Sequence, residues 1–167
     1  MAPVAVIVGP PGAGKTTVGE AVAELLGVPF TDTDAIIEAK AGKPIPEIFF
    51  DDGEPHFRDL EREAIAESLG SFGGVLALGG GAILNESTRA ALAAHTVVFL
   101  SVELTDAVKR VGLGAGRPLL SVNPRATLKF LMEERRPLYA AVATYTIKTD
   151  ARPPEEIAEE LAALLKS

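Results

Sequence analysis

The chain has 167 residues, a formal net charge of −7 and 47% hydrophobic residues, which predicts one domain with a mostly aliphatic core. The acidic balance excludes a general nucleic-acid surface, and the absence of cysteine excludes disulfides and thiolate zinc sites. No apolar run is long enough to span a bilayer. We therefore expect a cytoplasmic protein that binds neither nucleic acid nor membrane.

The first motif follows the apolar segment Val4–Val8, which we predict as a buried strand. Gly9–Thr16 reads Gly-Pro-Pro-Gly-Ala-Gly-Lys-Thr and fits the P-loop pattern, and an amphipathic helix is predicted after it up to Leu26. In such a loop the backbone N–H groups and the helix N-terminus hold a polyphosphate. Lys15 reaches the β- and γ-phosphates and the Thr16 hydroxyl binds Mg²⁺. The strand–loop–helix context predicts a nucleoside triphosphate site.

Two carboxylates follow a short predicted strand at Val28–Thr31. Asp32 and Asp34 are two residues apart, so at a strand end their side chains point to the same side. At the carboxyl edge of a parallel sheet we expect Asp32 to face Mg²⁺ and its waters and Asp34 to face the phosphoryl acceptor. Capping of the next predicted helix, Ala35–Ala41, is the alternative role.

A connector and a helix carry the next candidate residues. Lys43–Pro46 is expected to be a connector, Ile48–Phe50 a small apolar cluster and Asp51–Glu54 a turn before the helix. On that helix Arg58 and Glu61 are three residues apart and can pair. The pair is either a surface ion pair worth ~0.5 kcal/mol or a device that aims the Arg58 guanidinium at a substrate carboxylate.

Three glycines, Gly79–Gly81, follow the third predicted strand at Val75–Leu78. Glycine at a strand's carboxyl end leaves backbone N–H groups bare and lets a ligand lie close, although a flexible turn is the alternative. A short helix near Glu86–Ala94 and a strand at Val97–Val102 come next, and a further helix carries Arg110.

Basic residues concentrate between Lys109 and Arg136, where a bound triphosphate needs neutralisation. Within this stretch Gly112–Leu120 alternates glycine with other residues next to Arg117. We interpret it as a mobile lid that closes over substrate, excludes water and brings a cation to the transferred group. An ordinary surface loop and a solvated helix face are the alternatives.

The last predicted elements complete an alternating α/β pattern. Asn123 and Pro124 predict the start of a helix that ends at Arg135–Tyr139. A strand is expected near Tyr145–Lys148, and the final helix starts after Arg152–Pro154.

In this order and spacing the chain resembles the shikimate kinases, in the nucleoside-monophosphate-kinase-like group of P-loop proteins. The resemblance rests on the P-loop, Asp-Thr-Asp at 32–34, Asp52-Gly53-Glu54 with Phe57-Arg58 and Glu61, Gly79–Gly81, Arg117-Pro118-Leu119 and Arg135-x-Pro137-Leu138-Tyr139. It implies one domain over residues 1–167 with a three-layer α/β/α P-loop fold. The implied five-stranded parallel sheet has the order 2-3-1-4-5, with a lid at about 112–124 and a helical substrate-binding region at about 33–61.

The resemblance also implies the reaction. The family transfers the γ-phosphoryl group of MgATP to the 3-hydroxyl of shikimate, giving shikimate 3-phosphate and ADP on the route to chorismate and the aromatic amino acids. We therefore expect an ATP-dependent phosphotransferase with Mg²⁺ as cofactor, shikimate and ATP as small-molecule partners, and a monomer.

Carried over by motif, the resemblance implies roles for individual residues. Nucleotide contacts fall on Gly12, Ala13, Gly14, Lys15, Thr16, Thr17, Arg110, Arg117, Arg152 and Pro154. Acceptor contacts fall on Asp34, Arg58, Gly79, Gly80, Gly81 and Arg135. Catalytic roles fall on Lys15, Asp34 and Arg117, and the metal contacts are Thr16 directly and Asp32 through water. Arg136 adjoins Arg135, so which arginine reaches the substrate stays open, although the spacing from Pro137 favours Arg135.

Other functions remain as alternatives at this point. A gluconate or nucleoside monophosphate kinase would share the P-loop chemistry. A GTPase-type switch predicts an Asn/Thr-Lys-x-Asp element, which the sequence lacks. A binding module without catalysis is disfavoured because every expected reactive side chain is present.

Overall fold

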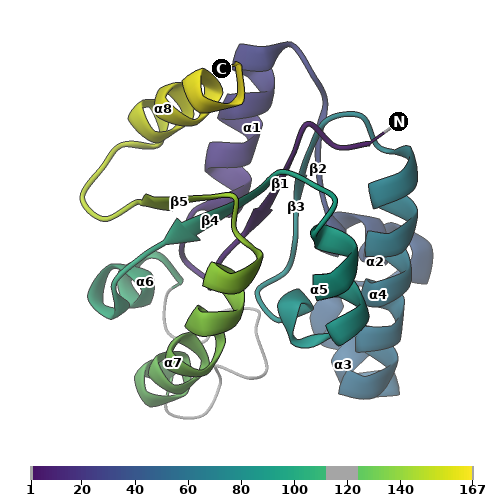
Figure 1. The fold of residues 1–167 in the computed structure, drawn as a ribbon. Helices are drawn as coiled ribbons and strands as arrows, with labels where there is room; N and C mark the ends of the chain where they lie inside the picture. Colours follow the sequence, from purple (N-terminus) through teal and green to yellow (C-terminus); the bar gives the residue numbers. More distant parts are fainter. Residues whose placement is uncertain (1, 112–123, 167) are drawn as a thin grey trace.

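The computed structural model describes residues 2–111 and 124–166. Their parallel sheet has five strands: β1 (Ala5–Val8), β2 (Phe30–Asp32), β3 (Val75–Ala77), β4 (Val97–Ser101) and β5 (Tyr145–Lys148). The strand order β2-β3-β1-β4-β5 confirms the predicted order and places the P-loop after the central strand (Figure 1).

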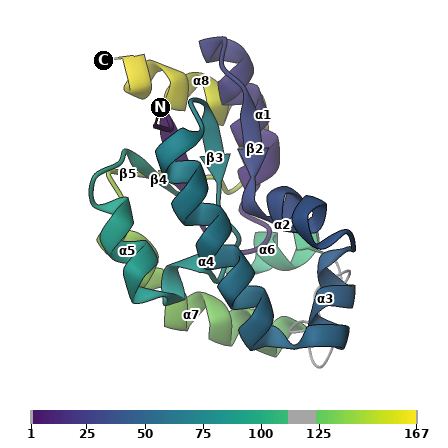
Figure 2. The same cartoon turned by 90° about the vertical axis from the view of Figure 1, so that its right-hand side faces the viewer.

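Helices cover both faces of this sheet. They are α1 (Lys15–Leu26), α2 (Thr33–Ala41), α3 (Ile45–Asp52), α4 (Glu54–Ser71), the 3₁₀ helix η1 (Ala82–Leu84), α5 (Glu86–Leu92), α6 (Leu104–Val111), α7 (Pro124–Val142) and α8 (Pro154–Lys166). The helices α1 and α8 pack side by side, and α4 and α5 lie on another side of the molecule (Figures 1 and 2). The three-layer α/β/α fold is confirmed.

Alternating residues of β1 show how the sequence builds two cores. Ala5 and Ile7 point into the core shared with α1 and α8, whereas Val6 and Val8 point into the core shared with α4, α5 and α7. All four side chains are buried, as expected for a strand covered on both faces.

A third apolar cluster joins α2, α3 and α4 and corrects part of the prediction for this region. Its buried members are Ile37, Ile48, Phe57 and Ala64. The segment predicted as connector, cluster and turn is largely the helix α3, because proline at a first turn has no N–H that the helix needs. Phe50 is 90% exposed, so the predicted apolar cluster does not include it.

The helix α7 corrects a second prediction, because it does not end at Arg135–Tyr139 but runs through Pro137 to Val142. A proline inside a helix costs about 3 kcal/mol. Apolar packing on both sides of it offsets this cost: Leu128 and Met132 are buried before Pro137, and Tyr139 is buried after it. Tertiary contacts therefore outweigh the local helix-breaking signal.

Some predictions concern residues outside this description. The lid sequence Gly112–Leu120, including Arg117, and the Asn123 cap lie outside the described residues, as does the side chain of Arg110. None of the helices in the described part of the chain is both long and apolar enough to cross a membrane.

Candidate active site

The P-loop has the backbone that its glycines predict. Gly9, Gly12 and Gly14 have φ angles of 156°, 84° and 88°, in a region that residues with a Cβ rarely adopt. A Cβ on Gly9 would also lie 2.6 Å from the Leu100 carbonyl oxygen. The Lys15 Nζ donates to the carbonyl oxygens of Gly9 and Pro10 at 2.8 and 3.1 Å. The lysine is therefore held over the loop that precedes its own helix.

A large cavity of about 760 Å³ contains most of the predicted nucleotide residues. Its lining includes Gly12, Ala13, Gly14, Lys15, Thr16, Thr17, Asp32, Asp34, Gly79, Arg152 and Pro154. Both aspartates thus share one cavity with the P-loop. This arrangement can bring a phosphoryl donor and a hydroxyl acceptor together.

The Asp-Thr-Asp motif reaches this cavity by a route that differs from the predicted one. The helix α2 already begins at Thr33, so Asp34 lies in its first turn and not on a strand. The argument from strand alternation was therefore wrong. The Asp32 carboxylate accepts from the Ala35 N–H at 2.7 Å, so Asp32 caps the helix, which was the alternative role.

Arg58 and Glu61 form a partly buried ion pair, not a surface one. The Arg58 Nη1 lies 2.8 Å from the Glu61 Oε1, and the Glu61 side chain is 4% exposed. Glu54 adds a second, more exposed contact to Arg58 at 3.3 Å. Burial raises the pKa of Glu61, while the charges of Arg58 and Arg135 oppose this shift. The geometry supports the interpretation that Glu61 orients the Arg58 guanidinium.

The three glycines Gly79–Gly81 are required by close approach. A Cβ on Gly79 would lie 3.0 Å from the Glu61 Oε2 and 3.3 Å from the Asp34 Oδ1. A Cβ on Gly81 would lie 2.5 Å from the Arg58 Nη2. This backbone therefore touches the acceptor residues contributed by α2 and α4. Not all of its N–H groups are bare, because Gly79 donates to the Thr33 Oγ1 at 3.1 Å.

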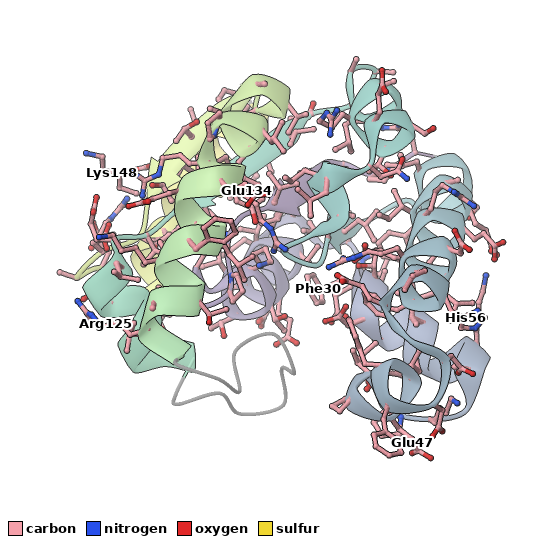
Figure 3. The ribbon with its side chains drawn as sticks, turned by 90° about the horizontal axis from the view of Figure 1, so that it is seen from below. Phe30, Glu47, His56, Arg125, Glu134 and Lys148 are labelled. Carbon is pink, nitrogen blue, oxygen red and sulfur yellow. The ribbon has the colours of Figure 1, made fainter. Side chains whose placement is uncertain are left out.

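The two adjacent arginines of α7 differ in burial. Arg135 is 5% exposed, whereas Arg136 is exposed. The Arg135 Nε is buried and has no hydrogen-bond partner among the described residues. Figure 3 shows α7, marked by Glu134, on one side of the view and α4, marked by His56, on the other. Arg135 and Arg58 thus come from two helices that face the site from different directions.

The predicted acceptor residues do not all line one cavity. Asp34 and Gly79 line the large cavity, but Arg58 and Gly81 line a smaller hollow of about 280 Å³ between α4 and the η1–α5 segment. The Arg58 guanidinium lies against Gly81, which adjoins the segment that contacts Asp34 through Gly79. The structure thus brings the acceptor residues close together without giving them one shared opening.

The Arg152 side chain, predicted to contact the nucleotide, is bound mainly by α8, the helix that follows it. Its guanidinium donates to the Glu156 and Glu160 carboxylates at 3.3 and 3.0 Å, and to the Lys148 carbonyl oxygen at 3.1 Å. Arg152 and Pro154 still line the large cavity beside the P-loop. The side chains of Arg110 and Arg117, also predicted to contact the nucleotide, lie outside the described part of the chain.

Two buried hydroxyls near the site had no role in the sequence prediction. Thr33 is completely buried between the two aspartates, and Tyr139 is 1% exposed one helical turn after Arg135. Tyr139 donates to the Gly80 carbonyl oxygen. The spacing of four residues, which places Tyr139 on the same helix face as Arg135, was the available signal.

A P-loop after the central strand, a 2-3-1-4-5 sheet and an adjoining aspartate–arginine surface define a small-molecule kinase of the P-loop class. The shikimate kinase family model matches residues 11–166. The shikimate kinase of Salinispora arenicola is 73% identical over 99% of both chains. The chain therefore belongs to the shikimate kinase family, and its reaction is the ATP-dependent phosphorylation of shikimate.

Solved structures agree with this assignment. The shikimate kinase from Acinetobacter baumannii in complex with shikimate has a TM-score of 0.94 and 40% identity, covering 99% of this chain and 93% of that one. A gluconokinase from Sinorhizobium meliloti has a TM-score of 0.60 and 27% identity, covering 97% of this chain and 90% of that one. The comparisons favour shikimate over gluconate as the acceptor.

Proposed function

We propose that the large cavity is where phosphoryl donor and acceptor meet, with ATP on the P-loop and the shikimate hydroxyl at Asp34. The observation that carries this proposal is the shared lining: Gly12–Thr17 and Asp34 surround one space of about 760 Å³. The backbone N–H groups of the loop bind the phosphates, and Lys15 exchanges its carbonyl partners for the β- and γ-phosphate oxygens.

Mg²⁺ fits the oxygen donors of this cavity. The described residues contain no group of three or more acidic, histidine or cysteine side chains that would form a complete metal cage. Mg²⁺ does not need one, because it is commonly bound by one or two protein oxygens together with waters and substrate phosphates. We propose Thr16 as the direct ligand and Asp32 as the acceptor for a metal-bound water. When bound, the ion neutralises charge on the transferred phosphoryl group.

We propose that the acceptor is held by charge complementarity. Arg58, oriented by Glu61, and the buried Arg135 bind the shikimate carboxylate, and the Gly79–Gly81 backbone lies beside the ring. The Acinetobacter baumannii structure was solved in complex with shikimate and has a TM-score of 0.94, which supports shikimate as the acceptor here.

In the chemical step the 3-hydroxyl oxygen of shikimate attacks the γ-phosphorus while the bond to the ADP oxygen breaks. Asp34 accepts the proton from the hydroxyl. Lys15 stabilises the negative charge on the transferred group, and Arg117 and Arg110 contribute from the lid and the adenine side. We further propose that the protein acts as a monomer in the cytoplasm, which a measurement of molar mass in solution and fractionation of cells would test.

An acceptor panel tests the substrate. We expect ADP release from MgATP with shikimate and none above background with quinate, gluconate, AMP or CMP. Turnover with another acceptor alone would contradict the proposed acceptor site but not the P-loop chemistry.

The variant Asp34→Asn tests the proposed base. We expect kcat to fall by roughly 10²–10⁴-fold, because proton transfer in the chemical step is lost. ATP affinity, measured by calorimetry, should stay unchanged because the P-loop is intact. Unchanged turnover would remove Asp34 from the mechanism.

A further inference from the structure

The Gly79–Gly81 backbone is held by two buried hydroxyl groups from distant parts of the chain. The Gly79 N–H donates to the Thr33 Oγ1 at 3.1 Å, and the Tyr139 hydroxyl donates to the Gly80 carbonyl oxygen. Thr33 is 0% exposed and Tyr139 is 1% exposed. Neither bond is part of a helix or of the sheet, so each ties this segment to another element: Thr33 to α2 and Tyr139 to α7.

The bond to Gly80 also fixes the peptide that follows. The described chain contains no cis peptide bond, so the Gly80 carbonyl and the Gly81 N–H share one plane and point in opposite directions. With the carbonyl directed at Tyr139, the Gly81 N–H is directed away from it. Within residues 2–111 and 124–166 the N–H groups of Gly80 and Gly81 make no backbone–backbone hydrogen bond. The Gly81 N–H is therefore a donor whose direction is set by the bond from Tyr139.

Each hydroxyl also adjoins a residue of the proposed acceptor site. Thr33 precedes Asp34 at the start of α2, and Tyr139 lies one helical turn after Arg135 on α7. The segment they hold lies against Arg58, Glu61 and Asp34. A displacement of this backbone would therefore change the spacing between acceptor groups from three helices.

The phenol ring of Tyr139 has a separate packing role. It stacks on Phe99 with a centroid distance of 5.1 Å and belongs to the core between the sheet and α4, α5 and α7. Removal of the hydroxyl alone keeps this stack. The hydrogen bond can thus be tested without loss of the ring.

We propose that Thr33 and Tyr139 are positioning residues for shikimate: their hydroxyls fix the Gly79–Gly81 backbone so that the Gly80 and Gly81 N–H groups and Arg58 lie at the correct distances from the acceptor. This inference rests on the proposed acceptor site. Neither residue lines the cavity proposed to hold ATP, so we expect them to act on acceptor binding and not on nucleotide binding.

The first test is Tyr139→Phe, with Tyr145→Phe as the matched control, because these are the two tyrosines of the chain. The substitution removes the bond to the Gly80 carbonyl oxygen and also the contact of the hydroxyl with the Arg135 side chain. It is expected to raise the KM and the Kd for shikimate about fivefold to tenfold. The KM for MgATP should change less than twofold. Tyr145→Phe should change neither constant, since Tyr145 lies on the edge strand β5 away from this segment.

Thr33 offers an internal rescue. Thr33→Val removes the hydroxyl at nearly constant volume and should raise the KM for shikimate. Thr33→Ser keeps the hydroxyl and should have a KM for shikimate close to that of the wild type. Equal losses in both variants, or equal rises in the KM for shikimate and MgATP, would show a merely structural role and overturn the proposal.

A readout without substrate separates this proposal from the proposed function. The amide ¹H–¹⁵N resonances of Gly80 and Gly81 should shift in Tyr139→Phe and not in Tyr145→Phe. Unshifted resonances would overturn the positioning role. If the resonances shift in Tyr139→Phe but the wild-type protein does not turn over shikimate, the positioning role would stand and the proposed function would be contradicted.

Discussion

The protonation of Glu61 is governed by its burial and by the neighbouring arginines. Its carboxylate is almost completely buried, and desolvation raises its pKa although Arg58 and Arg135 favour the charged form. A buried charge of this kind is retained where it orients a partner, and here the partner is the guanidinium proposed to bind the substrate carboxylate. The cost of burial should be visible in the pH dependence of stability.

Glu61→Gln tests this cost. Because the pKa of Glu61 is higher in the folded than in the unfolded state, its contribution to stability is complete below the unfolded value of about 4.3 and decreases as the pH rises through the folded pKa. The free energy of unfolding of the wild type, relative to Glu61→Gln, should therefore fall in urea titrations as the pH rises above about 4.3. If the free energy of unfolding of the wild type relative to Glu61→Gln instead rises with pH, the effect of Arg58 on the pKa of Glu61 outweighs that of desolvation.

Arg135 and Arg136 form a natural matched pair. Arg135→Lys keeps the charge but loses the guanidinium fork at a buried position, so we expect a rise of roughly tenfold or more in the KM for shikimate. Arg136→Lys changes an exposed side chain, so its KM for shikimate should stay within about twofold of the wild-type value. Steady-state kinetics at saturating MgATP provide the comparison. A larger rise in KM for Arg136→Lys than for Arg135→Lys would indicate that Arg136 binds the shikimate carboxylate.

At the scale of elements, the segment between β3 and η1 shows why glycine is needed where no unusual backbone angle requires it. Gly81 has a φ of −97°, which any residue adopts, but a Cβ there would meet the Arg58 guanidinium at 2.5 Å. The obstacle is the end of a flexible side chain, which can move. A side chain at position 81 should therefore leave the fold stable but impair acceptor binding by displacing Arg58.

Gly81→Ala should displace Arg58 and raise the KM for shikimate about tenfold or more, with a small change in melting temperature. Gly70→Ala on α4 is the control, because a Cβ there meets nothing within 4 Å. It should stabilise the helix by about 0.5–1 kcal/mol and leave the kinetics unchanged. A Gly81→Ala protein with normal kinetics would show that Arg58 does not act from its present position.

At the scale of the molecule, the cavity is built by elements from both halves of the sheet. The P-loop follows β1, Asp32 ends β2 and Asp34 follows it, and Gly79 follows β3, while Arg152 and Pro154 come from the segment after β5. Ligands that fill such a site bind the folded state and not the unfolded chain. They should therefore stabilise the whole fold.

Thermal unfolding tests this linkage. At about 100 times the Kd, a ligand adds about 2.7 kcal/mol, which corresponds to roughly 5–10 °C for a chain of this size. We expect such a rise with MgATP and a separate rise with shikimate. Gluconate at the same concentration should cause none, and an equal rise with gluconate would contradict the acceptor assignment.

The sequence by itself determined the strands, the P-loop and the order of the motifs, because these depend on short-range signals. Apolar runs predict buried strands, and a glycine-rich loop followed by lysine and threonine predicts phosphate binding. The pairing of Arg58 with Glu61 also followed from helical spacing, since the two residues are one turn apart. These local rules were sufficient to identify the family, whose strand order the structure confirms.

Only the tertiary structure decided which side chains are buried and which distant groups meet. It packed α3 against α2 and α4, continued α7 through Pro137, and buried Arg135 while leaving Arg136 exposed. It also joined Thr33 to Gly79 and Tyr139 to Gly80, across 46 and 59 residues of sequence. No local pattern encodes such contacts, because they arise when apolar faces of several helices pack onto one sheet.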